Sequence, residues 1–124
     1  MLRACNRVLT PGGRISFLVI ALSGESSPEV RAGDVGPEFA DADPGYPALM
    51  AAADFADIVV IDVTADYAQT LDDWTTAWDT ERTELESLLG AADFADRQTR
   101  RQRAAQAVRA GDLQRLWVTA RRPV

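Results

Sequence analysis

A turn and a long apolar run indicate the fold class of this chain: Thr10-Pro11-Gly12-Gly13-Arg14-Ile15-Ser16-Phe17-Leu18-Val19-Ile20-Ala21-Leu22. Residues 2–9 carry apolar side chains at helical spacing, and the proline and two glycines that follow end this helix. Residues 14–22 are then apolar at both odd and even positions, which is typical of a strand covered on both faces. Such a strand belongs in the interior of an α/β sheet.

Further elements follow this strand in a regular order. Residues 23–45 are polar and rich in proline and glycine, and we expect a long loop there, of the kind that is often functional. A short helix ending at Ala53 leads to a second, β-branched strand at 57–64. Residues 67–110 have helical periodicity, with a stop at Gly90 that predicts two helices, and residues 113–120 alternate as a third strand.

Composition narrows the possible classes of protein. A length of 124 residues is typical of one domain. A content of 47% hydrophobic and 26% charged residues is typical of a globular domain with a packed core and a charged surface. The apolar runs are far shorter than the roughly 20 residues of a membrane helix, and no signal peptide is evident. Because the chain has one cysteine, it cannot form an intrachain disulfide. Because it has no histidine, it can form neither a Ser-His-Asp arrangement nor an imidazole zinc site. We expect a cytoplasmic protein with no membrane partner.

Charge is distributed unevenly along the chain. Residues 23–96 hold 18 acids against two arginines, and residues 97–124 hold eight arginines against Asp112. Four of these arginines (Arg97, Arg100, Arg101 and Arg103) fall on a predicted helix without the interleaved aromatic residues of a nucleic-acid platform. With an overall charge of −6, we expect no nucleic-acid partner and expect these arginines to pair with the acidic helix of the same chain.

The stretch Arg7-Val8-Leu9-x-Pro11-Gly12-Gly13-Arg14-Ile15-x-Phe17 resembles a signature of class I S-adenosylmethionine-dependent methyltransferases, where it leads into the fifth strand. The family has a Rossmann-like α/β sheet with strand order 3-2-1-4-5-7-6, in which strand seven is antiparallel. By this resemblance 14–22, 57–64 and 113–120 correspond to strands five, six and seven, with a two-helix insertion between the last two. Asp54 stands where the family's helix-to-strand passage usually has glycine, so a positive φ is expected there.

The resemblance makes residues 1–124 a single partial domain, the C-terminal half of a methyltransferase fold. The family's cofactor-binding motifs precede strand five, so no cofactor-binding residue can be assigned in this chain. Gly12-Gly13 is not a substitute, because it precedes a strand instead of opening a helix. The complete family enzyme uses S-adenosylmethionine, whereas we expect no cofactor for this chain alone. We assign no catalytic residue and no metal ligand, and we expect the chain to be inactive alone.

Four aromatic residues are candidates for a substrate wall. In related small-molecule methyltransferases the segments after strand five and between strands six and seven often cover the methyl acceptor. By that resemblance the candidates here are Tyr46, Tyr67, Trp74 and Trp78. The alternative is that Trp74 and Trp78, four residues apart, only pack their helix against the rest of the fold.

Two functions of different classes follow for the whole chain. It is either the C-terminal portion of a small-molecule methyltransferase that lacks its cofactor-binding half, or a non-catalytic α/β module that binds another protein. In both cases the apolar strand at 14–22 would have one edge without its family neighbour, and exposed edges recruit other strands. The expected partner is therefore a second copy of the chain, joined through that edge, or a missing N-terminal half.

Overall fold

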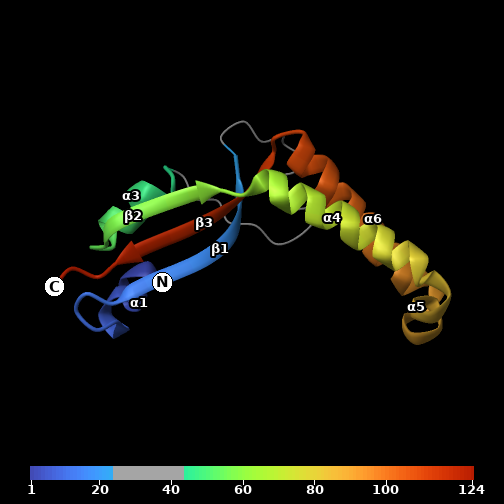
Figure 1. Cartoon of the computed structure of the whole chain (residues 1–124), viewed down its shortest axis with the longest axis horizontal. Coiled ribbons are helices and arrows are strands. Elements are labelled where there is room, and N and C mark those ends of the chain that lie inside the picture. The colour runs from blue at the N-terminus through green and yellow to red at the C-terminus, as the bar shows by residue number, and fades with distance from the viewer. Residues whose placement is uncertain (24–43) are drawn as a thin grey trace.

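The computed structural model describes residues 1–23 and 44–124, which form a small sheet with a long helical hairpin projecting from one end (Figure 1). The predicted loop at 23–45 lies almost entirely outside the described residues. The three strands are β1 (Arg14–Leu22), β2 (Ala56–Asp62) and β3 (Leu113–Arg121). Their bounds differ from the predicted ones by no more than two residues.

The strands are ordered β1-β3-β2, and β3 runs antiparallel to both neighbours. The β1–β3 ladder is continuous from the Arg14–Arg121 pair to the Leu22–Leu113 pair. Because β3 lies between the other two strands, the connection from β1 to β2 passes over its position, whereas α4, α5 and α6 return the chain from β2 to the strand beside it. This order and this antiparallel strand confirm the 5-7-6 arrangement expected for the end of a methyltransferase sheet.

Two short helices, α1 (Leu2–Val8) and α3 (Tyr46–Ala52), cover one face of the sheet and lie behind it in Figure 1. Met50 of α3 and Val118 of β3 are fully buried at this contact. Inward-facing residues at alternate strand positions complete the cluster: Ile15, Phe17, Val19, Ile58, Val60, Leu116 and Ala120. The period-2 alternation of the strands therefore sends one set of apolar side chains toward the helices and the other set to the opposite face.

The helical segment contains three helices, not the two predicted: α4 (Thr64–Thr80), α5 (Arg82–Leu89) and α6 (Ala91–Arg109). The first predicted helix is divided at Glu81, whose φ of −97° and ψ of 20° depart from helical values. Gly90 ends α5 with a φ of 89°, as a C-terminal glycine commonly does. The bases of α4 and α6 pack on the end of the sheet through Tyr67, Leu71, Val108 and Leu113.

The passage from α3 into β2 contains two aspartates with positive φ. Asp54 has a φ of 64°, which confirms the backbone conformation expected where the family usually has glycine. Asp57, with a φ of 51°, was not anticipated. It lies at an irregularity in the β2–β3 register between Ala56 and Val59. Bulges of this kind bend a strand and redirect a side chain.

The expected pairing of α6 arginines with the acidic helix is only partly correct. Arg97 and Arg100 pair instead with aspartates of α6 itself, Asp93 at 3.3 Å and Asp96 at 3.1 Å. One ion pair does join the two long helices, between Arg109 and Asp72. The i,i+4 spacing of aspartate before arginine makes the pairs within α6 geometrically simple, which explains why they form locally.

Candidate functional site

The structure separates the four aromatic residues predicted to line a substrate wall. Tyr46 lies on α3, against the sheet, where its ring meets that of Phe17 edge-on with centroids 5.6 Å apart. Tyr67 is buried at the base of the hairpin, with the guanidinium of Arg115 over its ring at 4.8 Å. Trp74 and Trp78 lie farther out along α4. Among the described residues, the four side chains are thus divided between the sheet, the base of the hairpin and the outer part of α4.

Burial raises the pKa of both tyrosines above the ordinary phenol value. For Tyr46 the cause is desolvation by the surrounding apolar residues. For Tyr67 desolvation also raises the pKa, and the positive charge of Arg115 acts in the opposite direction. Both phenols are therefore neutral at physiological pH and available as hydrogen-bond donors rather than as bases.

Trp74 and Trp78 share one cation. The guanidinium carbon of Arg101, on α6, lies 4.4 Å from the ring centroids of both indoles. Desolvation lowers the pKa of Arg101, and the neighbouring charge of Arg97 lowers it further. Arginine stays protonated despite such shifts, so the cation–π contact persists at physiological pH.

A closed set of contacts surrounds this arginine and joins α4 to α6. Arg101 donates to the side-chain carbonyl of Gln98, which is buried, and the Gln98 amide donates to Asp79 at 3.0 Å. Asp79 pairs at 2.9 Å with Arg82. Aromatic contacts lead from Arg82 back to Arg101. The guanidinium carbon of Arg82 lies 4.8 Å from the ring centroid of Phe94, and the Phe94 ring stacks on Trp78 with centroids 5.6 Å apart.

This geometry favours packing as the main role of the two tryptophans. One surface of each indole is occupied by Arg101, and the ring of Trp78 is also stacked on Phe94. Trp74 nevertheless keeps 50% of its surface exposed, so part of its ring is free to meet another molecule. Their role as substrate contacts stays a prediction.

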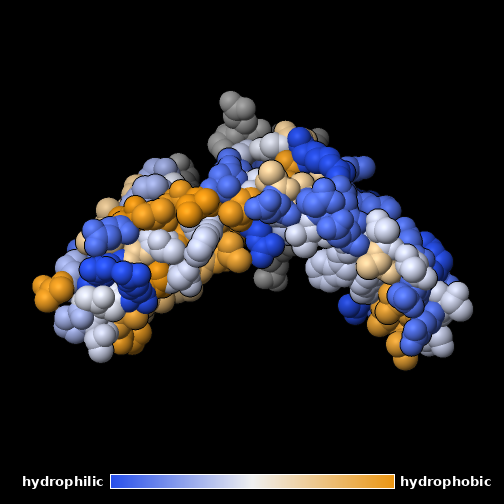
Figure 2. Space-filling view, viewed as in Figure 1, coloured by the Kyte–Doolittle hydropathy of each residue, from blue (hydrophilic) through white to orange (hydrophobic). Residues whose placement is uncertain are grey.

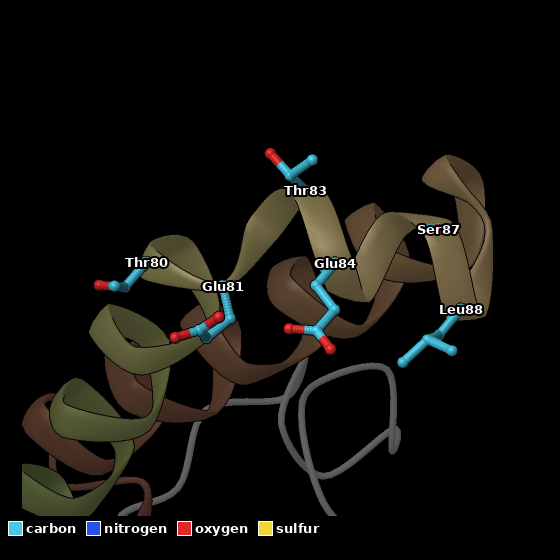
Figure 3. Close-up of a pocket in the computed structure, with 6 residues that line it drawn as sticks. All are labelled: Thr80, Glu81, Thr83, Glu84, Ser87 and Leu88. Carbon is cyan, nitrogen blue, oxygen red and sulfur yellow. The ribbon is translucent and has the colours of Figure 1, made fainter.

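Two of the shallow hollows among the described residues are lined by none of the four aromatic candidates. One, of 560 Å³, lies at the junction of α4 and α5 and is lined by Thr80, Glu81, Thr83, Glu84, Ser87 and Leu88 (Figure 3). The other, of 410 Å³, lies on the sheet near the start of β1. In the described ranges, no group of three potential ligands is arranged to hold a metal ion, and no helix is long and apolar enough to cross a membrane.

The sheet face opposite α1 and α3 is the largest feature that sequence reasoning missed. Leu18, Trp117 and Ile61 are directly paired across the three strands and form an apolar row, with 54%, 43% and 44% of their surfaces exposed. Val59 extends the row along β2. Figure 2 shows apolar surface gathered over the sheet, whereas the hairpin is mostly hydrophilic. The alternation of Leu116 and Trp117 along β3 was the available signal for two differently covered faces.

The glycine turn before β1 has a structural role. Gly12 has a φ of 76°, and its N–H donates to the Arg122 carbonyl at 2.9 Å, which ties the turn to the end of β3. A Cβ at Gly13 would come within 2.8 Å of the Thr10 carbonyl oxygen. Both glycines are therefore explained by backbone geometry and close approach, without any bound ligand.

No protein-family model and no curated relative matches the chain, but solved structures do. The chain superposes on phosphoethanolamine N-methyltransferase 2 of Haemonchus contortus, in complex with phosphomonomethylethanolamine and S-adenosylhomocysteine, with a TM-score of 0.88 and 13% identity. It also superposes on the cyclopropane synthase MmaA2 of Mycobacterium tuberculosis, with a TM-score of 0.78 and 13% identity. A third match, the [4+2]-cyclase SpnF, has a TM-score of 0.65 and 19% identity.

These superpositions cover 99%, 97% and 99% of this chain, but only 29%, 48% and 43% of the three larger proteins. The chain thus has the fold of the C-terminal part of S-adenosylmethionine-dependent methyltransferases. At identities of 13–19%, the likeness establishes the fold and not the reaction.

Proposed function

We propose that this chain is the C-terminal portion of an S-adenosylmethionine-dependent methyltransferase that acts on a small molecule. In this proposal the cofactor is held by a half of the fold that lies outside these 124 residues, and the chain alone is inactive. The observation that carries the proposal is the β1-β3-β2 sheet with its central antiparallel strand. Its superposition on a methyltransferase with a TM-score of 0.88, over 29% of that protein, supports it.

The open edge of β1 supports the same proposal. Within residues 1–23 and 44–124, β1 pairs with β3 along one edge, and no strand lies on the other. The strand has nine residues, and unpaired backbone groups over such a length favour the addition of another strand. In the proposed enzyme, a strand of the cofactor-binding half pairs here.

The proposed cofactor is S-adenosylmethionine, and the proposed acceptor is a small molecule. Two complexes of the matched N-methyltransferase contain S-adenosylhomocysteine and S-adenosyl-L-methionine. The same protein's other ligand, phosphomonomethylethanolamine, is a small molecule. We propose that the exposed part of Trp74 contacts the acceptor. Trp74 belongs to the segment between β2 and β3, and Arg101 covers only part of its ring.

Co-expression tests the proposed split of function. The coding sequence next to that of this chain is searched for a glycine-rich strand-turn-helix segment, and the product is co-expressed with the tagged chain. We expect the two polypeptides to purify together and the complex to bind S-adenosylhomocysteine. A folded chain that does not associate with such a half would contradict the proposal.

A second candidate function is a non-catalytic module that binds a protein. The observation that favours it is the apolar row of Leu18, Trp117 and Ile61, because contiguous exposed apolar side chains are typical of surfaces that bind other proteins. A promoter directly before Met1, together with no adjacent cofactor-binding half, would favour this module.

A further inference from the structure

The hollow on the exposed sheet face collects cationic and hydroxyl side chains. It has a volume of 410 Å³ and lies at the end of the sheet where β1 begins. Its lining consists of Arg14, Ile15, Ser16, Asp57, Val59, Thr119, Ala120 and Arg121. The hollow is separate from the aromatic and arginine contacts of the hairpin.

Strand register explains how the polar groups come together. Arg14 of β1 is directly paired with Arg121 of β3, and Ser16 is paired with Thr119. Because side chains two residues apart on a strand share a face, both pairs project to the same side. Two guanidinium groups and two hydroxyl groups therefore lie at the corners of one small area of the sheet.

Two arginines paired directly across strands repel each other. The bulged residue Asp57 offsets part of this charge, since its carboxylate lies 3.7 Å from Arg121. The Asp57 side chain is 73% exposed, however, and at that distance the ion pair is loose. One aspartate against two arginines leaves the hollow with a net positive charge.

The hydroxyl of Ser16 is already oriented. The indole N–H of Trp117 donates to Ser16 Oγ at 2.8 Å, so this oxygen acts as an acceptor toward the indole. The hydroxyl proton of Ser16 is then available to donate to another group. An anion placed between the two arginines would receive this hydrogen bond together with those of the guanidinium groups.

We propose that the hollow binds a phosphate group. The donors of two guanidinium groups and two hydroxyls surround the hollow and are too many for the two coplanar oxygens of a carboxylate. The three terminal oxygens of a phosphate group accept from more directions and therefore suit this arrangement. A bound phosphate also removes the repulsion between Arg14 and Arg121. The source is inorganic phosphate or a phosphomonoester, which present the same chemistry. This inference does not depend on the proposed methyltransferase function.

Titration calorimetry of the 124-residue chain with inorganic phosphate, at fixed ionic strength, tests the site. We expect saturable binding that weakens by about tenfold or more in Arg14→Gln and in Arg121→Gln, because each loses charge-assisted hydrogen bonds. Arg100→Gln is the matched control: it removes the same charge from an exposed position on α6 and should leave binding unchanged.

Thermal unfolding gives a second readout, because the melting temperature without phosphate measures the stability of the chain independently of binding. Arg14→Gln should be at least as stable as the parent chain, because the cross-strand repulsion is gone. Added phosphate should then raise the melting temperature of the parent chain more than that of Arg14→Gln. Tighter binding of glycerol 2-phosphate than of inorganic phosphate assigns the hollow to a phosphomonoester, and the reverse order assigns it to the free ion. Equal phosphate affinity in Arg14→Gln and the parent, no saturation at millimolar phosphate, or tighter binding of acetate would overturn the proposal.

Discussion

Replacement of Arg101 by leucine tests whether the tryptophans of α4 are part of the packing of the hairpin. Leucine keeps apolar bulk between α4 and α6 but removes the cation that lies 4.4 Å from both indole centroids. It also removes the hydrogen bond to the buried Gln98. If Arg101 joins the two helices, the loss should lower the stability of the whole chain.

The expected cost follows from these three contacts. Partly exposed cation–π contacts are worth about 0.5–1 kcal/mol each. A hydrogen bond contributes a net of roughly 0.5–1.5 kcal/mol. The free energy of unfolding should therefore fall by about 1.5–3.5 kcal/mol. For a chain of this length this corresponds to a decrease in Tm of roughly 3–6 °C per kcal/mol.

Urea unfolding followed by tryptophan fluorescence measures this difference, and a double-mutant cycle with Trp78→Leu isolates the contact. We expect a coupling energy of about 1 kcal/mol between Arg101 and Trp78. Arg100→Leu, which changes an exposed arginine next to it, should cost less than about 0.5 kcal/mol. Additive effects of Arg101→Leu and Trp78→Leu, within about 0.3 kcal/mol, would refute the packing role.

Three further predictions concern the sheet and its surroundings. Leu18→Lys should shift the chain toward monomer in sedimentation velocity, since a charge in the apolar row opposes association. Leu88→Lys, at an even more exposed leucine on α5, should not, and an equal effect of both would count against the row. The two buried phenols should contribute their full share of the free energy of unfolding below about pH 10, because folding favours their neutral forms. This contribution should fall as the pH rises through the raised pKa of Tyr46 and Tyr67. The loss should be smaller in Tyr67→Phe, and an unchanged pH profile would contradict this. Asp54→Gly should raise the free energy of unfolding by about 0.5–1 kcal/mol, because glycine adopts a φ of 64° without strain. Asp54→Ala should lower it. Urea unfolding measures both changes, and equal effects of the two would contradict the role of the positive φ.

The sheet could be predicted well from the sequence, and the reasons are local. The apolar run at 14–22 and the alternation at 113–120 determine two strands, and the turn at Pro11-Gly12-Gly13 fixes where the first begins. The order β1-β3-β2 was obtained from the family resemblance, because periodicity alone does not say which strands pair. Asp54 was predicted correctly for the same reason.

The hairpin and the exposed sheet face were predicted less well. The division at Glu81 has no glycine or proline to indicate it, so the heptad-like apolar pattern suggested one uninterrupted helix. The partner of Trp74 and Trp78 depends on the register between α4 and α6, which sequence spacing within one helix does not contain. The two-sided apolar pattern of β1 predicted cover on both faces. The helices α1 and α3 cover one face, whereas on the other the bases of α4 and α6 cover Ile20 and Leu22 and leave Leu18 exposed.

The hollow near Arg14 depended on contacts that no sequence pattern specifies. Its cross-strand pairs Arg14–Arg121 and Ser16–Thr119 join residues more than 100 positions apart, and they follow from strand register alone. The bulge at Asp57 adds the only carboxylate of the lining. Tertiary register, rather than propensity or composition, therefore assembled both the hollow and the arginine contacts of the hairpin.

We propose that this chain supplies one half of a methyltransferase fold and that the cofactor site lies in the other half. Calorimetric titration with S-adenosylhomocysteine, after circular dichroism has confirmed folding, tests it most directly on the chain alone and on its complex with a co-expressed cofactor-binding half. We expect no saturable binding by the folded chain and one binding site per complex. Micromolar binding by the chain alone, or no binding by the complex, would contradict it.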